Sequence, residues 1–73
     1  MNEINIKING IKKKITYKKK IFLINILDDY FQNYKKLKIA VALNNKLIVQ
    51  NKWHEVCLKD QDSIEIVKAF PGG

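Results

Sequence analysis

The chain contains no arginine, and among its 73 residues it has one cysteine, one proline, one histidine and three glycines. A single cysteine excludes an internal disulfide framework and suits a reducing compartment. No apolar run approaches the roughly 20 residues that span a bilayer, and no signal peptide precedes the first patterned segment. We therefore expect no membrane partner and a protein that works where it is made, in the cytoplasm or, if plastid-encoded, in the plastid stroma.

The absence of arginine also argues against sequence-specific binding of nucleic acid. All basic residues are lysines and the net charge is +7, so polyanions are attracted without specificity. Proteins that recognise a specific base sequence rely on the bidentate hydrogen bonds of arginine. The composition argues against a specific nucleic-acid partner, and a small basic nucleic-acid-binding domain remains an alternative class.

The small size of the chain argues against an enzyme. A single domain of 73 residues buries only about 60% of its unfolded surface, which leaves little room for a catalytic cleft. His54 lacks companions for a metal site or a triad, and Asp60 and Asp62 lack the other ligands of a calcium loop, so we expect them to shape a turn. Cys57 is expected to be a small buried hydrophobe. The sequence predicts no catalytic residue, no metal and no bound cofactor.

The first half of the chain predicts a hairpin followed by a helix. Residues 3–9 alternate, a turn at Asn9-Gly10 needs two positive φ angles, and a return strand runs from Ile11 to about Tyr17. From about 21 to 34 the spacing becomes helical, without an N-cap residue at the start. The residues expected in the core of the hairpin are Ile4, Ile6, Ile8, Ile11 and Ile15, with Lys13 at the rim. The helical stripe consists of Leu23, Ile24, Leu27, Phe31 and Tyr34, flanked by Ile26 and Tyr30.

The second half predicts three more strands. Residues 39–43 alternate, residues 44–46 form a turn with Asn45 left-handed, and residues 47–49 form a short strand. Residues 50–63 are expected to be irregular, with Trp53, Val56, Cys57 and Leu58 under the sheet. Residues 64–70 are apolar at nearly every position, which is typical of a central strand.

This order of elements indicates an α+β fold, a β-grasp or ubiquitin-like architecture. One helix would cover a mixed sheet of about four to five strands, with the last strand parallel to the first. We expect residues 1–70 to form the domain and residues 71–73 to form a flexible tail that ends in Gly-Gly.

The tail carries the functional prediction. Glycine lacks Cβ, so the carboxyl group of Gly73 can enter a narrow slot in another protein. Pro71 fixes its own φ and biases Phe70 toward extended conformations, while Gly72 keeps a pivot. We expect the Gly73 carboxylate to be the reacting group, presented by Gly72, Pro71 and Phe70. The docking surface is expected on the sheet face away from the helix, at Ala40, Ala42, Val67 and Ala69.

The stretch 41–73 resembles the ThiS family of sulfur carriers in thiamin biosynthesis. The resemblance rests on Val41 to Val49, Trp53, Leu58 to Ala69 and the final Gly72-Gly73. Family members usually carry glycine where Asn45 stands and often where Gln61 stands, and a Pro-Arg pair where Gln50-Asn51 stands. Pro71 is close to the tail of MoaD, the related carrier of molybdopterin synthesis, which is the runner-up.

The resemblance implies a protein co-substrate and the partners that act on it. An E1-like enzyme, ThiF, would adenylate Gly73, and sulfur from a cysteine desulfurase relay would convert the adenylate to a C-terminal thiocarboxylate. The thiocarboxylate would donate its sulfur to the thiazole synthase ThiG, and the free carrier is expected to be a monomer. A ubiquitin-like modifier, joined through the same tail to a lysine, is a further alternative.

Overall fold

The first hairpin forms as its sequence predicts. In this computed structural model, which describes residues 1–30 and 39–68, β1 (Asn2–Ile8) and β2 (Ile11–Tyr17) pair antiparallel. The turn between them has φ values of 51° at Asn9 and 82° at Gly10, as a type I′ turn requires. Every second side chain of β1 is buried: Ile4, Ile6 and Ile8.

Strand β2 lies at the edge of the sheet and contributes less to the core than its sequence suggests. Ile15 is half-buried, but Ile11 is 59% exposed, so its predicted core position is wrong. Ile11 pairs with Ile8 next to the turn, on a strand with a neighbour on one side only. Lys13 is exposed, as a rim position requires.

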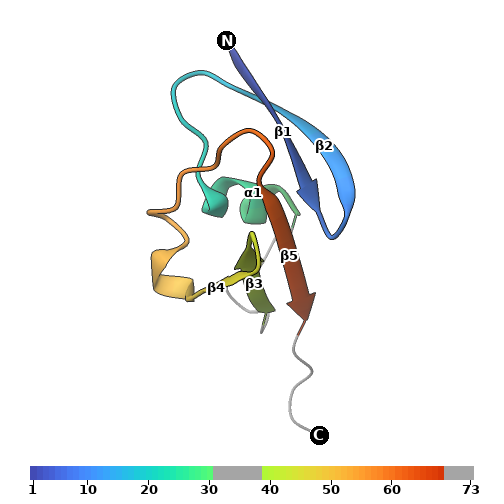
Figure 1. Ribbon diagram of the computed structural model, residues 1–73. Coiled ribbons are helices and arrows are strands. Elements are labelled where there is room, and N and C mark those ends of the chain that lie inside the picture. Colours follow the sequence, from blue (N-terminus) through green and yellow to red (C-terminus); the bar gives the residue numbers. More distant parts are fainter. Residues whose placement is uncertain (31–38, 69–73) are drawn as a thin grey trace, which may run out of the picture.

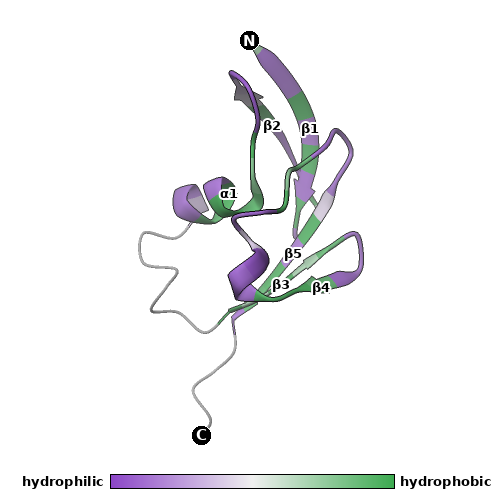
Figure 2. Cartoon of the chain, turned by 90° about the vertical axis from the view of Figure 1, so that its left-hand side faces the viewer, coloured by the Kyte–Doolittle hydropathy of each residue, from purple (hydrophilic) through white to green (hydrophobic). Residues whose placement is uncertain are grey.

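The sheet has five strands in the order β2-β1-β5-β3-β4. The last strand, β5 (Ser63–Lys68), lies in the middle, parallel to β1 and antiparallel to β3 (Ile39–Leu43), and β4 (Lys46–Ile48) forms the other edge. Helix α1 (Leu23–Tyr30) lies behind the sheet in Figure 1, and the side view shows the two layers (Figure 2). The predicted mixed sheet with one covering helix is confirmed.

Helix α1 buries a stripe slightly rotated from the predicted one. Leu23, Ile26 and Leu27 are buried, whereas Ile24 is only half-buried. Ile26, expected at the flank, is therefore a core residue. The predicted helix extends to residue 34, and its Phe31 and Tyr34 lie outside the described residues.

The start of α1 is capped by another part of the chain. The Leu23 N–H donates to the Val56 carbonyl (2.8 Å) and the Ile24 N–H to the Trp53 carbonyl (3.3 Å). The Asn25 side chain accepts from the Phe22 N–H at 2.9 Å, which is half of a capping box. Because residues distant in sequence supply the acceptors, no conventional N-cap residue is needed before the helix.

The segment between β4 and β5 covers part of the core. It begins with a 3-10 turn, Gln50–Lys52, and buries Trp53 (2% exposed) and Leu58 (3% exposed), as predicted. Cys57 is exposed, which corrects the expectation of a buried thiol. Residues 56–58 are extended and bridge to Phe22, so Cys57 points out while its two neighbours point in.

The remaining core comes from the inner faces of β3 and β5. Asn44 and Asn45 adopt φ values of 52° and 70° in the β3–β4 turn, and the predicted left-handed Asn45 is confirmed. The buried hydrophobic residues form one cluster: Ile4, Ile6, Ile8, Leu23, Ile26, Leu27, Val41, Trp53, Leu58, Ile64 and Ile66. No helix in residues 1–30 or 39–68 has the length and apolarity that crossing a membrane requires.

Candidate functional site

The strand register decides which residues occupy the outer face of the sheet. Ala40 pairs with Val67, and Ala42 pairs with Glu65 on one side and with Leu47 on the other. Their chain neighbours Val41 and Ile66 are buried in the core, and side chains alternate along a strand. These residues therefore project away from α1, as the sequence predicts for Ala40, Ala42 and Val67.

The outer face carries an apolar patch beside the end of β5. Three of its large side chains are well exposed, Leu47 at 67%, Val49 at 57% and Val67 at 61%. Val49 follows β4 with extended backbone (φ −69°, ψ 149°), so it faces the same side as Leu47. We call these residues the apolar patch: Ala40, Ala42, Leu47, Val49 and Val67. Adjoining exposed apolar side chains are typical of a surface that binds a partner.

Two members of the apolar patch are absent from the sequence prediction. Leu47 and Val49 belong to a run of three apolar residues, 47–49, which hides any alternation. The sequence feature that indicates their position is the hairpin turn at Asn44-Asn45, because a two-residue hairpin places Leu47 opposite Ala42.

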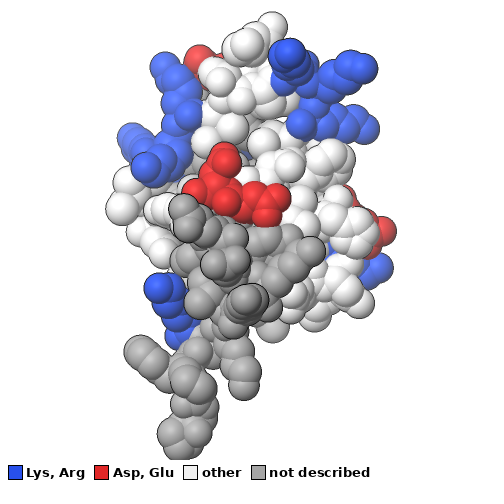
Figure 3. All heavy atoms as spheres, turned by 180° about the vertical axis from the view of Figure 1, so that it is seen from behind, with Lys and Arg blue, Asp and Glu red and all other residues white. Residues whose placement is uncertain are grey.

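Polar residues surround the apolar patch on the rest of the outer face. Glu65 borders it within β5, and a hollow of about 420 Å³ lies further along, lined by Asn5, Ile6, Lys7, Lys12, Gln61 and Ser63. The opposite side of the molecule carries charge instead: Asp28 and Asp29 are exposed on α1, and Figure 3 shows acidic atoms gathered between groups of lysines on that side. The apolar patch therefore lies on the sheet side, among polar and charged residues.

Strand β5 is held in place by two asparagine side chains, one at its start and one at its fourth residue, Ile66. At its start, Asn44 Oδ1 accepts from the Ser63 N–H at 2.9 Å. Further along the strand, Asn9 Oδ1 accepts from the Ile66 N–H at 2.7 Å, and Asn9 Nδ2 donates to the Ile66 carbonyl at 3.3 Å. The strand that leads to the C-terminal residues is thus fixed by both flanking hairpin turns.

The predicted reacting group and its tail lie beyond the described residues. The description of β5 ends at Lys68, so Ala69, Phe70, Pro71, Gly72 and Gly73, the end of the predicted last strand and the proposed 1–70/71–73 boundary fall outside it. The structure does place the apolar patch at the end of β5 from which these residues continue.

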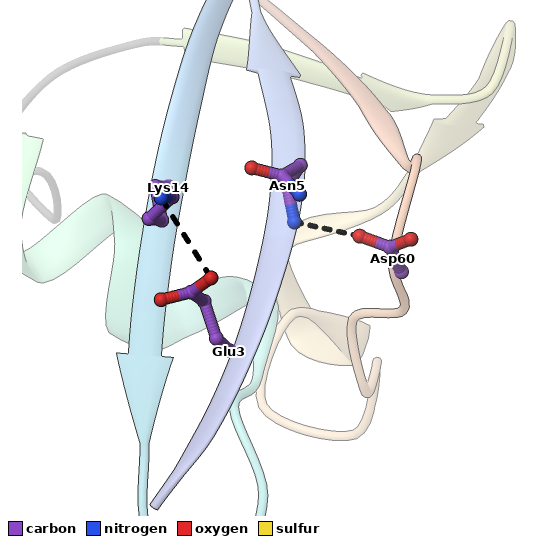
Figure 4. Close-up of polar contacts among 4 residues, drawn as sticks. All are labelled: Glu3, Asn5, Lys14 and Asp60. Carbon is purple, nitrogen blue, oxygen red and sulfur yellow. Dashed lines mark hydrogen bonds and ion pairs between the residues drawn. The ribbon is translucent and has the colours of Figure 1, made fainter.

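The aspartates before β5 shape a turn, as predicted. Asp60 Oδ1 accepts from the Asn5 N–H at 2.7 Å (Figure 4), and Asp62 Oδ2 accepts from the Lys59 N–H at 2.8 Å. The hydrogen bond from Asn5, helped by one from Gln61, lowers the pKa of Asp60 below its usual value of 3.8. Gln61 between them has a φ of 72°, a left-handed conformation that suits glycine better.

Trp53 and His54 lie in different environments. Trp53 is a core residue whose Nε1 donates to the Ile48 carbonyl at 2.9 Å, and His54 is exposed. Within residues 1–30 and 39–68, no three His, Cys, Asp or Glu side chains are grouped so as to hold a metal ion.

Comparisons with known proteins agree with this architecture. The model of the ThiS family matches residues 2–73. The uncharacterized protein ycf40 of Pyropia yezoensis is 33% identical over 76 residues, covering 99% of this chain and 96% of that protein. The ycf40 protein of Porphyra purpurea is also 33% identical, over 52 residues, covering 71% of this chain and 66% of that protein.

A solved structure shows the same fold. The crystal structure of the thiamine biosynthesis protein ThiS from Geobacter metallireducens superimposes with a TM-score of 0.78 at 18% sequence identity. The match covers 96% of this chain and 100% of that one. The predicted β-grasp fold is confirmed by this similarity.

Proposed function

This chain belongs to the ThiS family, and we propose on that premise that it is a sulfur carrier of thiamin biosynthesis whose reacting group is the Gly73 carboxylate. The observation that carries the proposal is the family match over residues 2–73, which includes the terminal Gly72-Gly73. The protein acts as a co-substrate and its partners supply the catalysis. It works in the plastid stroma if plastid-encoded and otherwise in the cytoplasm.

The chemistry begins with activation, because an ionised carboxylate is a poor electrophile. A Gly73 carboxylate oxygen attacks the α-phosphorus of ATP on a ThiF-like enzyme, and pyrophosphate leaves. A persulfide sulfur from a cysteine desulfurase relay attacks the acyl carbon, and the bond to AMP breaks. A thiol then reduces the acyl disulfide to the thiocarboxylate, which donates its sulfur to a ThiG-like thiazole synthase.

The folded body contributes docking and direction. A monomeric carrier would lay the apolar patch on the activating enzyme, and Ala69 stays a predicted residue of this interface. The last four residues reach at most about 13–14 Å when extended, so the carboxyl group enters the partner while the domain stays outside. Pro71 limits the entropy that Phe70 and the tail lose on threading.

The direct test mixes the purified protein with ATP and a ThiF-like enzyme, and separately with a MoaD-activating enzyme. Intact mass spectrometry should show an AMP adduct with the first, and a thiocarboxylate once sulfur donor and thiol are added. Replacing Gly73 with tryptophan should leave the urea unfolding curve unchanged and abolish the adduct. Adduct formation only with the MoaD-activating enzyme, or an isopeptide bond to lysine, would overturn the assignment.

The docking surface is tested separately. Val67→Lys and Leu47→Lys place a charge in the apolar patch, and each should raise the KM for the carrier about tenfold, as expected for residues near the centre of an interface. Ile11→Lys is the matched control, because Ile11 is equally exposed on a strand but outside the apolar patch. Equal KM values for all three variants would exclude this face.

A further inference from the structure

The hydrogen-bond ladder between β1 and β5 continues past the point where β1 ends. Its regular rungs join the Lys7 N–H to the Asp62 carbonyl (2.9 Å) and the Asn9 N–H to the Ile64 carbonyl (2.8 Å). The next rung would require the N–H of residue 11 to reach the Ile66 carbonyl. Ile11 cannot supply it, because the chain has turned and Ile11 pairs with Ile8 in β2.

The side chain of Asn9 supplies the missing rung. Its amide carries both an N–H donor group and a carbonyl acceptor, as a peptide group does, and it bonds both the N–H (2.7 Å) and the carbonyl (3.3 Å) of Ile66. Ile66 is only 8% exposed. Without the Asn9 side chain, its backbone N–H and carbonyl would therefore lose their hydrogen-bond partners, which water replaces poorly. Asn9 reaches them because its φ of 51° is left-handed.

We propose that Asn9 is a positioning residue for the C-terminal reaction: its side-chain amide fixes β5 at Ile66, in the strand that leads to the C-terminal residues. This inference rests on the proposed function for its catalytic consequence. Beyond Ile66, the strand pairing of β5 is with β3, through Val67 with Ala40 and Lys68 with Ile39. The Asn9 amide therefore extends the hydrogen bonding on the β1 side of β5 beyond the backbone rung at Ile64.

The chain offers a graded set of variants. Asn9→Gly keeps the turn conformation and removes both bonds, whereas Asn9→Asp keeps an acceptor for the Ile66 N–H and loses the donor. Asn45→Gly makes the same replacement at a left-handed position of the other hairpin. Asn44→Gly removes side-chain bonds to the opposite end of β5, at Ser63 and Asp62.

The first measurement uses the unbound protein and amide hydrogen exchange by NMR. Asn9→Gly should speed exchange at Ile66 about tenfold relative to Ile64, the effect expected of a lost hydrogen bond, and Asn9→Asp should have a smaller effect. Asn45→Gly should leave that ratio unchanged. An unchanged ratio in Asn9→Gly would overturn the proposal.

The second measurement separates positioning from stability through adenylation kinetics. Asn9→Gly should lower kcat about tenfold and leave the KM for the carrier unchanged, because the apolar patch is intact. Asn44→Gly, which destabilises the start of β5 at Ser63, should leave kcat unchanged while the protein is folded. Equal losses of kcat in these two variants would show a purely structural role. If no activating enzyme adenylates the wild-type chain, the proposed function fails, and the exchange ratio still decides whether Asn9 holds β5.

Discussion

Replacing Asp62 with alanine should cost about 2 kcal/mol of folding stability. Asp62 is 9% exposed, and its carboxylate joins two turns: Oδ2 accepts from the Lys59 N–H at 2.8 Å, and Oδ1 accepts from Asn44 Nδ2 at 2.9 Å. Hydrogen bonds to a charged acceptor contribute about 1.5–3 kcal/mol each. Lys59 and Asn44 are exposed, so in the alanine variant water replaces part of each lost hydrogen bond. The variant also lacks the desolvation cost of a charge near the core. Both corrections reduce the sum to about 2 kcal/mol.

Urea denaturation followed by tryptophan fluorescence measures this cost directly. Trp53 is the only tryptophan and is 2% exposed, so its emission reports on the core. With a slope near 1 kcal/mol/M, as expected for a small domain, the midpoint should fall by about 2 M and the slope should not change. Asp62→Asn keeps a carbonyl acceptor and should lose only about 1 kcal/mol.

A double-mutant cycle identifies the partner. Asp62→Ala and Asn44→Gly should be coupled by about 1 kcal/mol, because each removes the same hydrogen bond. Stability losses below about 0.5 kcal/mol for Asp62→Ala, or equal losses for the alanine and asparagine variants, would refute the assigned role of the carboxylate.

Three further predictions concern the neighbouring residues. Gln61→Gly should raise stability by about 0.5 kcal/mol, because the relief of a left-handed φ exceeds the added entropy of glycine; a lower urea midpoint would contradict this. The Asn5 hydrogen bond lowers the pKa of Asp60 below 3.8. The contribution of this bond to folding stability is therefore complete above pH 3.8, and it is lost as the pH falls through the folded-state pKa of Asp60. The stability difference between wild type and Asp60→Asn should therefore shrink on acidification below pH 3.8, and a constant difference would be inconsistent with the bond. Cys57 is exposed, so iodoacetamide should label the native protein about as fast as the unfolded one, and strong protection would show that the thiol is buried.

The parts of the fold that were predictable from sequence are those determined locally. Asn9-Gly10 and Asn44-Asn45 tolerate positive φ, so both hairpins and their registers follow from adjacent residues. The alternation of residues 39–43 likewise placed Ala40 and Ala42 on the outer face, where the register confirms them.

The errors arise where distant segments decide the environment. The acceptors for the first helical N–H groups come from Trp53 and Val56, so the sequence before α1 contains no cap to recognise. Ile11 is exposed because β2 is an edge strand, and Cys57 points outward because its extended segment bridges to Phe22. None of these facts is encoded within a few residues of the position concerned.

The two faces of β5 contribute differently to folding stability. Its inward residues Ile64 and Ile66 are buried, and its backbone is fixed by ladders and by the amides of Asn9 and Asn44. None of those interactions uses the outward side chain of Val67, which is 61% exposed. A substitution there changes little that stabilises the fold. The fold therefore does not require an apolar side chain at this position, and the docking role that we propose for the apolar patch would account for one.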